Sequence, residues 1–166
     1  MLHLLLDYAR WRGDVSLQRS PMELVTIRNA SKRTHHAPSL SVADFQNLLA
    51  QLHEPFHTIA LVSVCFGLRI SECLALKWSD VDWLNSKLFV RRGIVRQRVG
   101  ETKTEYSNRP LAVDGAMLEV LKAWKQATLF SGPEDWVFAS PVQLGWLPWS
   151  MDALGDAYRK AAKAEG

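Results

Sequence analysis

The sequence is poor in cysteine, with only Cys65 and Cys73 among 166 residues. Both stand among apolar residues, and neither belongs to the Cys-x-x-Cys or cysteine–histidine arrays that zinc requires. The adjacent histidines His35 and His36 cannot reach one metal as easily as two histidines one helical turn apart. We therefore expect both cysteines to be small core residues in a reducing compartment, and we expect no metal site.

Long apolar runs are also missing. None approaches the ~20 residues of a membrane-spanning helix, and the leucine-rich start, residues 1–6, is short and has no basic region before it. We expect a protein that is neither exported nor embedded in a membrane. The composition is typical of a packed globular protein, with 48% hydrophobic residues, 22% charged residues and seven tryptophans. A length of 166 residues excludes two large domains.

The net charge of +3 is modest, but the positive charge is clustered. Between residues 87 and 109 only Glu101 and Glu105 oppose seven basic residues, so the rest of the chain is negative overall. The seven are Lys87, Arg91, Arg92, Arg96, Arg98, Lys103 and Arg109. Positive charge gathered on one element is typical of a phosphate-binding surface. It also fits a solvated β-hairpin, and charge alone does not decide between the two.

The N-terminal part predicts one helix followed by a connecting segment. The apolar residues that repeat there at helical spacing are Leu4, Leu5, Tyr8, Ala9 and Trp11. Gly13 can end this helix, and Pro21 breaks the pattern. Residues 28–39 contain basic but no acidic residues, which predicts an interdomain linker carrying Lys32 and Arg33. Such a linker could lie along a DNA backbone, or it could simply be solvated.

Two helices are predicted next. Ser41 and Asp44 form a capping box that begins a helix over residues 42–53. Residues 56–66 are apolar on most sides, so the second helix should be buried, and Gly67 can end it in the left-handed conformation.

The rest of the chain predicts short strands and further helices. Strand-like alternation occurs over residues 87–91, 95–102 and 109–113, which predicts a small antiparallel sheet rather than a barrel. One helix begins after Asp114, and the last begins near Ser150. The expected fold class is α+β and mainly α, a helical domain with a small three-stranded antiparallel sheet.

Arg69 is the first candidate for chemistry. It follows the buried helix and its glycine turn, and it opens a short helix that runs through Leu76. Apolar residues flank it, and few arginines stand in such a place without a partner. A guanidinium can direct two N–H donors onto a phosphate, which lysine cannot do. The structural alternative is an internal salt bridge from Arg69 to Glu72, three residues on.

Lys103 is the second candidate. It stands near the expected tip of the basic hairpin, where it could enter a groove and donate a proton. Taken alone, an exposed hairpin lysine can also be merely solvated. Taken with Arg69 and the order of the elements, it forms part of one pattern.

That pattern resembles the tyrosine recombinase, or phage integrase, family. The family's first catalytic arginine lies in a segment similar to residues 67–82, GLRISECLALKWSDVD. The hairpin with its catalytic lysine is similar to residues 103–111. The resemblance implies the end of a helical core-binding domain at residues 1–27, a basic linker at 28–39 and the N-terminal portion of the catalytic domain at 40–166.

The resemblance implies DNA strand breakage and rejoining through a 3′-phosphotyrosyl intermediate, with neither a metal nor a nucleotide cofactor. Arg69, oriented by Glu72, would neutralise non-bridging phosphate oxygens, and Lys103 would protonate the departing 5′ oxygen. Contacts to the DNA backbone are expected from Lys32, Arg33, Arg91, Arg92, Arg96, Arg98 and Arg109. The expected partners are double-stranded DNA and other integrase protomers, in the cytoplasm of a bacterium, from a bacterial or phage gene.

The later residues of the family's site are not in this sequence. A His-x-x-Arg box, a further His or Trp and the tyrosine nucleophile would follow residues 150–163, and none is present. Tyr158 comes before that point and should pack on the apolar face of the last helix, and Tyr106 lies in the hairpin. We expect a truncated recombinase that binds DNA weakly and does not catalyse alone.

The missing segment would leave apolar surface near Trp146, Trp149 and Leu154, and such surface promotes self-association. Two other interpretations remain open. One is a non-catalytic helical DNA-binding module in which Arg69 only pairs with Glu72. The other is a fragment of a type IB topoisomerase.

Overall fold

The computed structural model describes residues 2–16, 39–101 and 109–163, and the chain divides into two units, Met1–Ser39 and Leu40–Gly166. In the first unit, α1 (Leu2–Arg12) ends at Gly13, which has a φ of +79° and donates its N–H to the Arg10 carbonyl. The helix and its glycine stop are therefore confirmed. The linker residues Lys32 and Arg33 lie outside the described residues.

The second unit begins with two helices whose ends follow their capping residues. α2 (Val42–Gln51) opens with the expected capping box: the Asp44 N–H donates to Ser41 Oγ at 3.2 Å, and the Ser41 N–H donates to the Asp44 carboxylate at 3.0 Å. α3 (Phe56–Cys65) ends before Gly67, at φ +59°. The expected bounds hold to within two residues.

Only one face of α3 is buried, and this separates the two cysteines. Ile59 and Val62 are fully buried, whereas Val64 and Cys65 are exposed, so the expectation that Cys65 is a core residue is wrong. Cys73, on α4 (Ile70–Leu74), is fully buried. Burial raises the pKa of the Cys73 thiol to about 12, with the Ser63 hydroxyl opposing the shift, so this thiol stays protonated at neutral pH.

The strands form two separate antiparallel pieces. The three-stranded sheet has the order β1-β2-β5, built from β1 (Val81–Asp82), β2 (Lys87–Val90) and β5 (Arg109–Ala112). The second piece is a two-stranded hairpin of β3 (Arg92–Val95) and β4 (Arg98–Glu101), here called the basic ribbon.

The single strand expected over residues 95–102 is therefore wrong. The chain reverses at Arg96 and Gln97, whose φ angles are +51° and +59°, and Val95 pairs with Arg98 across this turn. A two-residue hairpin turn with both φ angles positive matches the strand twist, and it usually contains Asn and Gly. Because neither residue is present at positions 96 and 97, no turn was predicted there. The third strand of the sheet is β1, which was not among the three predicted segments.

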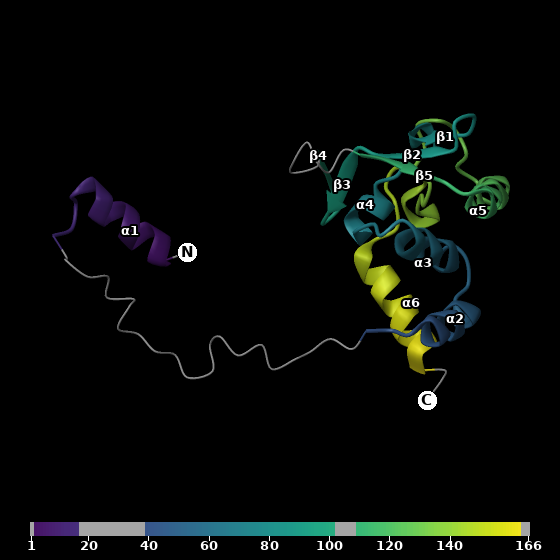
Figure 1. Cartoon of the computed structure of the whole chain (residues 1–166), viewed down its shortest axis with the longest axis horizontal. Coiled ribbons are helices and arrows are strands. Elements are labelled where there is room, and N and C mark those ends of the chain that lie inside the picture. The colour runs from purple at the N-terminus through teal and green to yellow at the C-terminus, as the bar shows by residue number, and fades with distance from the viewer. Residues whose placement is uncertain (1, 17–38, 102–108, 164–166) are drawn as a thin grey trace. The chain divides into compact units, whose positions relative to one another are not determined.

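The remaining helices cover the main core of the second unit, beside which Leu52, Ala60 and Ala161 form a smaller buried cluster. α5 (Gly115–Ala127) is capped by Asp114, which accepts the Met117 N–H at 2.8 Å, and α6 (Met151–Lys163) begins after Ser150. The largest fully buried side chains include Trp78, Phe138, Ile59, Leu74, Leu88 and Leu121. In Figure 1, α6 runs beside α2, and β3 lies against α4.

The domain is thus mainly helical with small antiparallel sheets, as expected. Among the described residues, every helix is too short or too polar to cross a membrane.

Candidate nucleic-acid interface

Arg69 is presented at the N-terminal end of α4 by a buried carboxylate. The Glu72 side chain is only 6% exposed, and its two oxygens accept from Arg69 Nη1 at 2.9 Å and from the Arg69 N–H at 3.1 Å. The Arg69 side chain is 74% exposed. Its apolar neighbour Leu68 is buried, whereas the Arg69 guanidinium faces solvent.

This arrangement combines an ion pair with an open donor surface. The salt bridge expected from the three-residue spacing is present, and it uses one terminal nitrogen of the guanidinium. Nη2 and Nε make no hydrogen bond to any described residue. Because an arginine presents five N–H donors in a rigid fork, the donors left over can bind an anion while Glu72 holds the orientation.

Asp80 forms a second buried ion pair, which sequence reasoning missed. It closes the short 3₁₀ helix η2 (Trp78–Asp80), and its side chain is 1% exposed. One oxygen accepts the Lys77 N–H at 2.8 Å and Arg92 Nη1 at 2.6 Å. The other accepts Arg92 Nη2 at 3.1 Å and Arg91 Nη1 at 3.4 Å. Its place between Ser79 and Val81 offered no sequence signal for such a pair.

Arg92 is consequently different from the other arginines that were expected to contact DNA. Its side chain is 21% exposed, and both terminal nitrogens are held by Asp80. The side chains of Arg96 and Arg98, at the end of the basic ribbon, are exposed and make no hydrogen bond or ion pair to another described residue. The Arg109 side chain is half-buried, again without such a contact in the described part of the chain.

The basic ribbon adjoins the helix that carries Arg69. β3 packs on α4, Ile94 of β3 is buried, and a Cβ placed on Gly93 would lie 3.8 Å from the Ser71 carbonyl oxygen. The ribbon's turn is at Arg96 and Gln97, whereas Lys103 follows β4 and lies outside the described residues. The convergence of Lys103 with Arg69 therefore stays a prediction.

An apolar groove of about 400 Å³ flanks the Arg69 segment. Its walls are parts of α2, α3 and α6, together with Leu68 and Ile70 on either side of Arg69. Tyr158 lines this groove and packs against the core, as expected. Loss of hydration raises the pKa of the Tyr158 phenol to about 12, with Cys73 adding to the shift, so the phenol stays protonated at neutral pH.

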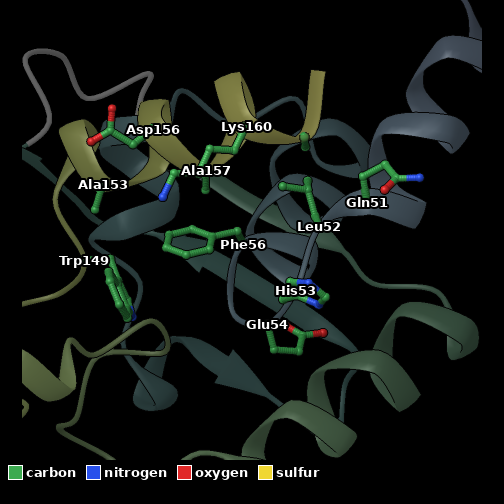
Figure 2. A pocket seen from close by; sticks show the side chains of 11 residues that line it. Gln51, Leu52, His53, Glu54, Phe56, Trp149, Ala153, Asp156, Ala157 and Lys160 are labelled. Atoms are coloured by element: carbon green, nitrogen blue, oxygen red, sulfur yellow. The ribbon is translucent and has the colours of Figure 1, made fainter. Parts of the chain in front are cut away.

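A larger cavity of about 670 Å³ lies between α6 and the turn from α2 to α3 (Figure 2). Phe56 and Trp149 form part of its wall, with ring centroids 5.0 Å apart in an edge-to-face arrangement. Its carboxylates are already bound, Asp156 to Arg159 at 2.6 Å and Glu54 to the Thr58 hydroxyl at 2.8 Å. The described residues contain no cluster of three potential metal ligands.

The apolar surface expected near the last helix is only partly exposed. Trp146 is 82% exposed and Trp149 is half-buried. Leu154 is buried, so its place in that surface was wrong, because it faces the core from the inner side of α6.

The arrangement of helices and small sheets is the fold of tyrosine recombinase catalytic domains. A solved complex of the transposon Tn1549 integrase with circular intermediate DNA matches with a TM-score of 0.75 over 95% of this chain and 54% of that one. A complex of the same integrase with transposon right-end DNA gives 0.69 over 95% and 55%. The identities are 16% and 19%, so this likeness shows the fold alone.

The sequence comparison defines the family. The description "Phage integrase family" matches residues 38–166, and the chain belongs to that family. A putative integrase/recombinase of Sinorhizobium fredii is 28% identical over 166 residues, covering 96% of this chain and 47% of that protein. The ICEBs1 integrase of Bacillus subtilis is 31% identical over 87 residues, which cover 50% of this chain and 24% of that protein. The chain spans about half the length of the first of these relatives and a quarter of the second.

Proposed function

We propose that this chain binds double-stranded DNA as part of a site-specific recombinase that breaks and rejoins strands through a 3′-phosphotyrosyl intermediate. The observation that carries the proposal is Arg69, an exposed guanidinium held from below by the buried carboxylate of Glu72. Family membership and the relatives solved with DNA support it.

In this proposal each group has one role. Arg69 donates to the non-bridging oxygens of the scissile phosphate, and Glu72 positions it. Lys103 protonates the departing 5′ oxygen, a step that typically contributes about 10²–10⁴-fold. The backbone contacts come from Lys32, Arg33, Arg91, Arg96, Arg98 and Arg109. Arg92 is left out because Asp80 already binds its guanidinium.

The catalytic part of the reaction needs residues that this sequence does not contain. The 166 residues include no His-x-x-Arg box, and Tyr158 is a packing residue with a protonated phenol. We propose that this polypeptide alone binds DNA without cleaving it. A phosphotyrosyl link stores the energy of the broken bond, so the reaction assigned to the whole recombinase calls for neither a metal nor a nucleotide cofactor.

The division of the chain is proposed on the same basis. Residues 40–166 would be the N-terminal portion of the catalytic domain, 1–27 the end of a core-binding domain, and 28–39 the linker between them. Other integrase protomers are proposed as partners, with exposed Trp146 as a site of self-association.

The affinity for a labelled duplex should fall as salt rises. Phosphate contacts release counterions, so the logarithm of the binding constant should fall linearly with the logarithm of salt concentration. Replacing Arg96 and Arg98 by glutamine should reduce this slope by about 1.8, since each phosphate contact contributes about 0.9. Fluorescence anisotropy across about 50 to 200 mM salt measures both effects.

A matched control removes the same charge from another surface. Arg159→Gln with Lys160→Gln, on the exposed side of α6, should leave the slope unchanged. The proposal fails if binding does not depend on salt. It also fails if the α6 pair changes the slope as much as the ribbon pair does.

A further inference from the structure

Two arginines and one backbone N–H donate to the buried carboxylate of Asp80, although one positive charge would be enough to neutralise it. Its two oxygens accept from the Lys77 N–H and from both terminal nitrogens of Arg92, and Arg91 approaches at 3.4 Å. Every contact except the one from Arg91 comes from a group that is itself largely withdrawn from solvent. The bidentate Arg92–Asp80 pair is therefore the strongest element of this cluster.

The position of Arg92 links three parts of the fold. Its guanidinium binds Asp80 of η2, and Nη1 also lies 3.4 Å from the carbonyl of Ala75, the residue that caps the C-terminal end of α4. Arg92 is the first residue of β3. The same five-residue helix thus holds Arg69 at its N-terminal end and is tied at its C-terminal end to the base of the basic ribbon.

The ribbon is a separate piece from the three-stranded sheet, so its position depends on other contacts at its base. Within the described residues, β3 and β4 pair only with each other, and β2 pairs with β1 and β5. Buried Ile94 and the packing of β3 on α4 anchor the ribbon, and within the described residues Arg91 and Arg92 supply the polar contacts at its base.

We propose that Asp80 and Arg92 form a positioning clamp that holds the basic ribbon in a fixed direction relative to Arg69, and that Arg92 itself does not contact DNA. This inference rests on the proposed DNA binding. It assigns Arg92 a role different from that of the exposed arginines around it. The clamp acts through Arg96 and Arg98, which make the phosphate contacts.

Arg92→Lys separates positioning from direct contact. Lysine keeps the positive charge that a phosphate contact needs but cannot form the two-pronged pair with Asp80. If the clamp aims the ribbon, Arg92→Lys should reduce the salt slope by about 1.8, as the Arg96→Gln, Arg98→Gln pair does. Adding that pair in the Arg92→Lys background should then change the slope no further.

The opposite result overturns the proposal. A direct phosphate contact predicts that Arg92→Lys keeps the wild-type slope and that the Arg96→Gln, Arg98→Gln pair still reduces it in the lysine background. A general loss of folding would also weaken every other contact, so Arg69→Gln is included as a control. Its effect on affinity should be the same in the wild-type and Arg92→Lys backgrounds.

A second variant guards against simple unfolding of the first. Asp80→Asn combined with Arg92→Gln removes both charges, so no unpaired buried charge remains. The salt slope of DNA binding should fall by the same amount as in Arg92→Lys. If this double variant is folded and binds like the wild type, the clamp is not needed and the proposal is wrong.

Hydrogen exchange distinguishes failure of the clamp from failure of DNA binding. Without DNA, the β3 and β4 amides should exchange faster in Arg92→Lys, while those of β2 and β5 should be unchanged. Faster exchange in the ribbon together with no DNA binding by the wild type would refute the proposed function but keep the tie between Arg92 and the ribbon. Unchanged exchange in the ribbon would refute the clamp itself.

Discussion

Replacing Asp80 by alanine is expected to lower the free energy of unfolding by about 3–5 kcal/mol. The change removes a carboxylate that is 1% exposed and leaves the mostly buried guanidinium of Arg92 without its partner. Losing one member of a buried ion pair typically costs this much, because the remaining charge has no compensation. Urea denaturation followed by tryptophan fluorescence measures the difference.

Asp82 is a matched control two residues further along the chain. Its carboxylate accepts from the backbone and side chain of Asn85 in an exposed turn, at 3.0 and 2.8 Å. These hydrogen bonds hold the pKa of Asp82 below its usual range, but no buried charge depends on them. Asp82→Ala should therefore destabilise the fold much less. Equal losses for the two variants would show that Asp80 has no special place in the fold.

The second large effect expected is the complete absence of a covalent adduct with DNA. The polypeptide should form no phosphotyrosyl link on a nicked suicide duplex, because it lacks the His-x-x-Arg box that the family's chemistry uses. Tyr158 is not expected to substitute, since its side chain packs against the core from α6 and is partly buried. A denaturing gel of protein and labelled duplex detects the adduct, with an intact integrase of the family as positive control.

An adduct formed by this chain would contradict that account. The sequence has three tyrosines, so Tyr→Phe variants at each would identify the nucleophile. Loss of the adduct in Tyr106→Phe, for example, would assign the chemistry to the segment between β4 and β5.

Local capping and spacing made much of the helical framework predictable. The Ser41–Asp44 box and the glycine after α3 act over a few residues, so their sequence signals are strong. The ion pair of Arg69 with Glu72 also follows from a separation of three residues, which brings side chains together at the start of a helix.

The parts that could not be predicted depend on contacts between residues far apart or on unusual turns. Asp80 is separated from Arg91 and Arg92 by eleven and twelve positions in the chain, and no local sequence pattern predicts these ion pairs. The turn at Arg96 has positive φ angles without glycine or asparagine. The alternation pattern therefore predicted one strand over residues 95–102, where the structure has the end of β3, a turn and β4. Cys65 was misplaced because a short apolar helix does not reveal which of its faces is covered.

The two ion pairs suggest how this surface is organised. Glu72 and Asp80 are both buried carboxylates, but Glu72 holds an exposed arginine and Asp80 holds a largely covered one. In the proposed function, Arg69 therefore remains available to a phosphate, and Arg92 supports the ribbon instead. Sequence alone could not separate these roles, because it does not show which carboxylate each arginine meets or how far each arginine is covered.

Side-chain NMR of arginine in a titration with duplex DNA tests the central claim most directly. With ¹⁵N-labelled protein, the Nε–H signal of Arg69 should shift and saturate as the duplex is added, while that of Arg92 should stay in place because Asp80 holds it. If the chain is saturated with DNA and the Arg69 signal has not moved, the guanidinium above Glu72 is not a phosphate ligand and the account is contradicted.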